Sequence, residues 1–221
     1  MSYILSYQSI CLSLSTPCLS FESDIPVHRG SYFDVFFEIV TRTVFLFPEL
    51  IEIACVAISF ILPCANNLSY TSGVSIFKLL QFAFSQYTIS SLKTTQSQEN
   101  LNYSACYKML TNAIHYNINR SVRENIPLVI VMMKNAKLLT KILKHDTEYD
   151  ECDQLLLFIK NVNAELRQSG KSFKASELEV FFTDPSCEHF TLPVLRAPRP
   201  DYDFSTGIDF ILEKLSSSFI V

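Results

Sequence analysis

The fold class is decided by one segment, residues 31–67, which reads SYFDVFFEIVTRTVFLFPELIEIACVAISFILPCANN. Ser31 is a favourable helix N-cap, and Asp34 places a carboxylate in the first turn, where it complements the helix dipole. The apolar side chains that follow have helical spacing; they are Phe33, Phe36, Phe37, Val40, Val44 and Phe47. Pro48 then ends this helix or opens the next one, because proline lacks the backbone N–H that a helix interior needs.

A second helix is predicted from Glu49 to Leu62. Its first turn is acidic, the residues that follow are almost all apolar, and Pro63 with Asn66-Asn67 stops it. Two helices joined by so short a connection form an antiparallel hairpin. The segment therefore predicts helix packed on helix.

The same pattern recurs along the chain. A third helix begins near Thr71 or Ser72, and a polar stretch over 90–100 is predicted to be a loop. Further helices are predicted over about 102–120, from Pro127 to His145, and over about 149–167, where Gly170 supplies a C-terminal cap. The six helices make three consecutive hairpins that start near residues 31, 72 and 125.

A spacing of roughly forty to fifty residues is the scale of HEAT and armadillo units. We therefore predict an all-α fold of HEAT/armadillo-like helical hairpins, a fragment of an α-solenoid. The alternative is a compact helical bundle. An elongated scattering profile would favour the first and a globular profile the second.

The two ends of the chain differ from the middle. Residues 1–30 mix Ser, Thr and Pro and are predicted to be an irregular lead-in to a helical-repeat domain over 31–168. In the mixed segment 169–221, Leu178, Val180 and Phe182 alternate with other residues, which predicts a short β-hairpin near 177–195. A final amphipathic helix is predicted over about 207–219.

The run Phe33-Asp34-Val35-Phe36-Phe37, followed by Arg42, by Phe47-Pro48-Glu49-Leu50 and by the stretch from Gly73 to Phe82, resembles a known family. It is similar to the C-terminal HEAT repeats of the importin-beta (karyopherin) superfamily, in its transportin-like branch, over residues 31–84. The resemblance implies a role in protein transport, with a cargo protein and a small GTPase as partners. It places none of their contact residues on this chain.

Charge argues against nucleic acid as a partner, because the net charge is −4 and phosphate binding needs a basic surface. Lys and Arg do gather between Lys134 and Lys144. Acidic residues follow at once, at Glu148, Asp150 and beyond, so this run is interpreted as a solvated helix face.

No motif for chemistry is present in the sequence. The chain has only four glycines, with no phosphate-cradling loop and no nucleophile elbow. Cys187-Glu188-His189 could offer two zinc ligands with Cys152 as a distant third, but a matched second pair is missing. We predict no catalytic, cofactor or metal site and therefore no enzymatic activity.

The compartment is predicted from cysteine usage and hydropathy. The seven cysteines are scattered without a CxxC pair, which is typical of a reducing compartment, the cytoplasm and/or the nucleus. The apolar run from Val44 to Ala65 contains Pro48, Glu49, Glu52 and Pro63. Carboxylates near mid-bilayer are costly, so no membrane span is predicted.

Aromatic residues crowd the first helix more than one buried face needs; they are Phe33, Phe36, Phe37, Phe45 and Phe47. We expect some of them to face a groove or a partner. The sequence thus predicts a non-enzymatic, protein-binding helical-repeat adaptor or a fragment like a nuclear transport receptor. The alternative is a compact, Bcl-2-like helical-bundle regulator that binds an amphipathic helix in an apolar groove.

Overall fold

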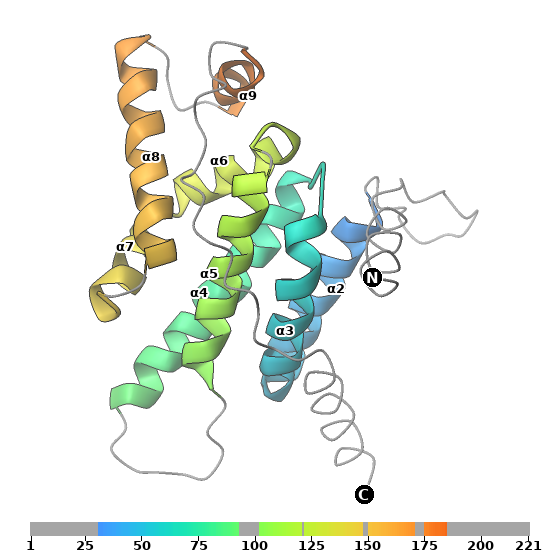
Figure 1. Ribbon diagram of the computed structural model, residues 1–221. Coiled ribbons are helices and arrows are strands. Elements are labelled where there is room, and N and C mark those ends of the chain that lie inside the picture. Colours follow the sequence, from blue (N-terminus) through green and yellow to red (C-terminus); the bar gives the residue numbers. More distant parts are fainter. Residues whose placement is uncertain (1–30, 93–101, 121, 148–149, 171–174, 185–221) are drawn as a thin grey trace, which may run out of the picture.

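The computed structural model describes residues 31–92, 102–120, 122–147, 150–170 and 175–184 (Figure 1). The helices are α2 (Tyr32–Leu46), α3 (Ile51–Ile61), α4 (Tyr70–Leu92), α5 (Tyr103–Arg120), α6 (Ile126–Lys134), α7 (Ala136–His145), α8 (Asp150–Gln168) and α9 (Ala175–Thr183). Short 3₁₀ turns are η1 (Pro48–Leu50), η2 (Leu62–Cys64) and η3 (Arg123–Asn125). The described residues contain no β-strand, which confirms the all-α fold class.

Helix α2 begins as the sequence predicts. Ser31 is its N-cap: the Ser31 hydroxyl accepts the Asp34 N–H at 3.3 Å, and the Asp34 carboxylate accepts the Ser31 N–H at 2.8 Å. This reciprocal pair is a capping box. Phe33 and Phe37 are fully buried, whereas Phe36, expected on the core face, is only partly buried. The core-facing stripe is therefore rotated slightly from the predicted one.

Pro48 separates the two helices of the first hairpin, and Pro63 follows the second of them. Phe47 has φ −131° and ψ 80°, outside the helical region that a following proline disfavours, and α2 ends there. Pro63 lies in η2, directly after α3. In the part of the chain that the structure describes, no helix is both long and apolar enough to cross a membrane.

The helices lie in two layers (Figure 1). In one layer α2 packs on α4 and α4 packs on α6, which leads into α7; in the other, α3 packs on α5 and α5 packs on α8. Contacts between α2 and α3, α4 and α5, and α7 and α8 join the layers. Three successive hairpins are thus stacked side by side.

Within the first layer, α2 and α4 run in the same direction. At the start of α4, the Ser72 hydroxyl donates to the Asp34 carboxylate at the start of α2, and the Ser69 N–H donates to it at 3.0 Å. Near the end of α2, the Phe45 ring meets the Phe82 ring edge to face, with 5.4 Å between centroids. Contacts at both ends therefore fix the register of α2 on α4.

The second layer is arranged in the same way. The Asn102 N–H, just before α5, donates to the Glu52 carboxylate in the first turn of α3. At the other end, the Asn117 amide of α5 donates to the carbonyls of Leu62 and Ala65 at 2.6 and 2.8 Å. Asn117 is buried, so these bonds satisfy carbonyls that water does not reach. They hold the connection between the first two hairpins against α5.

Helix α4 is the common element of the stack, because it contacts α2, α5 and α6. Its buried residues are Ser72, Gly73, Ser75, Ile76, Phe77, Leu79, Leu80, Ala83 and Phe84. Gly73 lies where α6 comes closest: a Cβ atom there would stand 3.2 Å from a Val131 methyl carbon and 3.5 Å from the Leu128 Cα. A larger side chain at this position would separate the second hairpin from the third.

The predicted helix from Pro127 to His145 is two helices in the structure. Asn135 separates α6 from α7 with φ −101° and ψ 16°, and its side-chain amide donates to the Val131 carbonyl at 2.8 Å. A short polar side chain that bonds its own backbone competes with helical hydrogen bonds. The resulting break changes the direction of the chain between α6 and α7.

The predicted β-hairpin near 177–195 is wrong where the structure describes it. Residues 175–183 form α9, and the buried side chains are Leu178, Phe181 and Phe182, while Val180 is 61% exposed. This spacing of three and four is helical, and α9 packs on α6. The alternation of Leu178, Val180 and Phe182 with other residues therefore wrongly indicated a strand. Residues 185–195, the predicted helix over 207–219 and the lead-in 1–30 lie outside the described residues.

The loop predicted over 90–100 does not begin at residue 90. Helix α4 continues to Leu92, and the remainder of the predicted loop lies outside the described residues.

The close approach at Gly73 gives the first testable prediction. Gly73→Leu should lower the free energy of unfolding by roughly 1–3 kcal/mol, because the added side chain collides with Val131 in a packed interface. Gly73→Ala is the matched control and should change stability by less than about 1 kcal/mol, because the gain in helix propensity offsets a tight contact. Urea denaturation followed by circular dichroism measures both. Equal effects of the two variants would contradict the close packing of α4 on α6.

Asp34 gives a prediction about pH. Burial raises the pKa of Asp34, but hydrogen bonds from Ser72, Ser69 and Ser31 together hold that pKa below its ordinary value. A carboxyl with a lowered folded pKa stabilises the fold at neutral pH, and this contribution is lost as the pH falls below about 4, through the folded pKa.

We therefore expect Asp34→Asn to cost about 1–2 kcal/mol at pH 7, the range for losing a helix cap and charged hydrogen bonds. The same substitution should cost less at about pH 3 than at pH 7, because the unfolded-state carboxyl, with its ordinary pKa of about 3.9, is largely protonated there and the contribution of the lowered folded pKa has begun to be lost. Denaturation midpoints of both proteins at the two pH values make the comparison. A difference that does not depend on pH would show that the charge of Asp34 has no role.

Candidate functional site

Two surface features of the described residues are candidates for binding. One is an exposed apolar cluster at the end of α2, which we call the α2-end cluster and define as Phe45, Leu46, Phe47 and Phe82. The other is a pocket between α4 and α7.

The α2-end cluster contains three consecutive large apolar residues that face solvent. Phe45 is 47% exposed, Leu46 is 74% exposed and Phe47 is 52% exposed. Phe82 of α4 is partly buried and supports the Phe45 ring from one side. Single exposed apolar residues are common on protein surfaces, but a contiguous group marks an interaction site.

The local backbone holds this cluster in place. Phe47 caps α2 by donating its N–H to the Thr43 carbonyl at 2.8 Å, and Pro48 then fixes the turn into η1. Leu46 and Phe47 therefore project from the end of a rigid helix and not from a long loop. A partner that covers them would lose little backbone entropy from this side of the interface.

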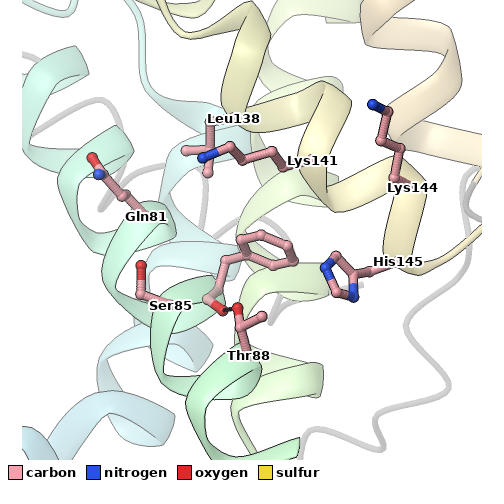
Figure 2. A pocket seen from close by; sticks show the side chains of 8 residues that line it. Gln81, Ser85, Thr88, Leu138, Lys141, Lys144 and His145 are labelled. Atoms are coloured by element: carbon pink, nitrogen blue, oxygen red, sulfur yellow. Dashed lines mark hydrogen bonds between the residues drawn. The ribbon is translucent and has the colours of Figure 1, made fainter. Parts of the chain in front are cut away.

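The pocket lies between the second and third hairpins and has a volume of about 400 Å³. Figure 2 shows side chains of α4 and α7 facing one another across it. The lining consists of Gln81, Phe84, Ser85 and Thr88 from α4 and Leu138, Lys141, Lys144 and His145 from α7.

The rim of the pocket is cationic. Lys141 and Lys144 are exposed, and neither takes part in any of the ion pairs found among the described residues. Asp146, the nearest carboxylate along α7, pairs instead with Lys108 of α5. In the part of the chain that the structure describes, none of the residues that line the pocket is acidic.

The floor of the pocket is apolar and rigid. Phe84 is only 5% exposed, and Leu138 packs against the core. The His145 ring meets the Phe84 ring edge to face at 5.5 Å and approaches the Tyr87 ring at 6.5 Å. These ring contacts fix the position of His145 at the end of α7.

The buried thiols are poorly suited to nucleophilic chemistry. A hydrogen bond with Cys106, together with burial, raises the pKa of the Cys55 thiol far above its ordinary value. Burial raises the pKa of Cys152 to about 12, and its thiol donates to the Leu139 carbonyl at 3.1 Å. The reactive form of cysteine is the thiolate, which such values suppress at neutral pH.

His115 is a further buried group. Burial lowers the pKa of its imidazole, and Nε2 has no hydrogen-bond partner in the structure. Burial therefore favours the neutral form of the ring, whose edge-to-face ring contact is with Tyr116.

Only one of the metal-ligand candidates from the sequence, Cys152, lies in the described residues, where no group of three or more His, Cys, Asp or Glu side chains could hold an ion. Cys152 is buried in α8, and Cys187 with His189 lies outside the described residues. Asp150, Glu151 and Asp153 occupy the first turn of α8, where negative charge complements the helix dipole.

Sequence reasoning missed the pocket. It interpreted the basic run from Lys134 to Lys144 as a solvated face, although Lys141 and Lys144 line this site. The available signal was a polar stripe on α4, with Gln81, Ser85 and Thr88 at helical spacing. Nothing in the sequence says which helix that stripe faces, because this depends on the break at Asn135.

Comparison with known proteins finds no match: no protein-family model fits the chain, and no curated protein and no solved structure matches it.

Proposed function

We propose that this protein is a non-enzymatic, protein-binding module of stacked helical hairpins, which docks a partner protein on the α2-end cluster. The observation that carries the proposal is the exposure of three consecutive apolar residues, Phe45, Leu46 and Phe47, on a helix end that is itself rigid. Burying such side chains contributes up to about 1.5–3 kcal/mol each. A partner that covers the cluster gains this energy without ordering a loop.

The proposal includes the HEAT/armadillo-like interpretation and the resemblance to the importin-beta family. The parallel pairs α2–α4 and α3–α5 are the packing expected of stacked repeats in which each unit contacts only the next. On this view the partner is a protein, for example transport cargo or a small GTPase, and the protein works in the cytoplasm and/or the nucleus. The layer arrangement supports the repeat interpretation and says nothing of the partner.

The alternative function is a compact regulator that receives an amphipathic helix in an apolar groove. Such a groove needs apolar walls along several turns. The pocket between α4 and α7 has lysines on its rim and amide and hydroxyl groups on its α4 side, so it fits this role poorly. The exposed α2-end cluster, which lies at a helix end, favours docking over groove binding.

The test is to place a charge in the α2-end cluster. Phe45→Asp combined with Leu46→Asp should weaken partner binding at least about tenfold, because a buried, unpaired carboxylate is costly to desolvate. A partner would first be identified by affinity capture, and then its purified form would be titrated by calorimetry. Because Phe45 also contacts Phe82, circular dichroism checks that the helices persist. Leu46→Asp alone leaves that ring contact intact and should weaken binding in the same direction.

Leu157→Asp is the matched control, since Leu157 is a comparably exposed residue on α8. It should leave binding unchanged. A protein lacking residues 1–22 should also bind normally. Loss of binding on this truncation, with the helices intact, would assign the partner to the N-terminal segment and reject the docking site on α2.

A further inference from the structure

We infer that the pocket between α4 and α7 binds an acidic peptide segment of a partner protein, in which carboxylate side chains alternate with an apolar one. This extends the proposed protein-binding function to a second surface. The pocket residues come from α4 and α7 and include none of the α2-end cluster. The two surfaces can therefore be tested separately.

Charge is the first argument for an acidic ligand. Lys141 and Lys144 lie three residues apart on one helix, both exposed and both outside the ion pairs of the described residues. The described residues of the pocket lining include no acidic one, although the whole chain has a net charge of −4. A cationic site on an acidic protein selects negative ligands locally and repels them elsewhere.

The floor and the α4 wall supply the second argument. Phe84 and Leu138 offer an apolar surface, whereas the Gln81 amide and the Ser85 hydroxyl offer hydrogen-bond donors. The Thr88 hydroxyl donates to the Phe84 carbonyl at 2.6 Å, so its oxygen remains free to accept a peptide N–H. An extended segment with carboxylates at the rim and an aliphatic side chain on the floor satisfies each of these groups.

Other anions fit less well. Phosphate sites commonly use forked arginine contacts or a helix N-terminus. None of the described residues that line this pocket is an arginine. Nucleic acid would need a longer basic track than two lysines and a histidine.

The pocket is also preorganised. The ring contacts of His145 with Phe84 and Tyr87 fix the end of α7 against α4, and Phe84 is itself buried. A ligand that enters therefore meets fixed walls, and binding carries no entropy cost for ordering the site. The mobile elements are the two lysine side chains, which can adapt to carboxylates in several positions.

The experiment measures fluorescence polarisation of a labelled peptide of repeated Glu-Glu-Leu, added to the full chain at low salt. We expect saturable binding that weakens as salt rises. Replacing Lys141 and Lys144 together by Glu should weaken binding about tenfold to a hundredfold, because two attractive contacts become repulsive. Replacing both by Arg should retain binding.

The matched control replaces Lys160 and Arg167 of α8 by Glu, which changes the net charge equally at positions outside the pocket lining. It should bind the peptide as the wild type does, and so should the Phe45→Asp, Leu46→Asp protein. The second result keeps this inference separable from the docking site on α2. A peptide in which Gln replaces Glu should not bind.

Three outcomes would overturn the inference. If the α8 control loses binding as strongly as the pocket variant, attraction is a property of the whole surface. If the Gln peptide binds equally, carboxylates have no role. If inorganic phosphate or a single-stranded oligonucleotide of matched charge displaces the peptide at equal concentration, the site is a general anion site and not an acidic-peptide site.

Discussion

The structure depends on the packing of α4, which is buried against α2, α5 and α6 at once. A helix in this position needs small residues where its neighbours come close, and Gly73 meets this need opposite Val131. Because α4 belongs to the second hairpin but contacts the first and the third, it fixes the position of the first hairpin relative to the third. The α2-end cluster and the pocket lie on its two sides.

Buried polar groups set the register that apolar packing alone leaves open. The Asp34 carboxylate accepts bonds from both helix starts, and the Asn117 amide holds the connection after α3. Each of these groups would be costly to leave unpaired, so a shift of one helix by a turn is penalised. The surfaces that result are therefore fixed in geometry, as a docking site requires.

Much of the fold could be predicted from local signals. The boundaries of the first hairpin's helices lie at Ser31, Pro48 and Pro63, as predicted. These boundaries are predictable because capping and proline effects act within a few residues. The break at Asn135 and the helix α9 were missed, since short apolar patterns fit either period and the outcome depends on contacts far along the chain. The pocket was missed for the same reason: its two halves come from helices more than forty residues apart.

Native-state hydrogen exchange tests the central role of α4 most directly. If α4 is the shared core of the stack, its amides between Ser75 and Phe84 should exchange only through global unfolding, with a free energy equal to that from denaturant titration. The amides near the exposed end of α2 should exchange more easily. Exchange of the α4 core at a clearly lower free energy than global unfolding, with α2 or α8 better protected, would contradict the account.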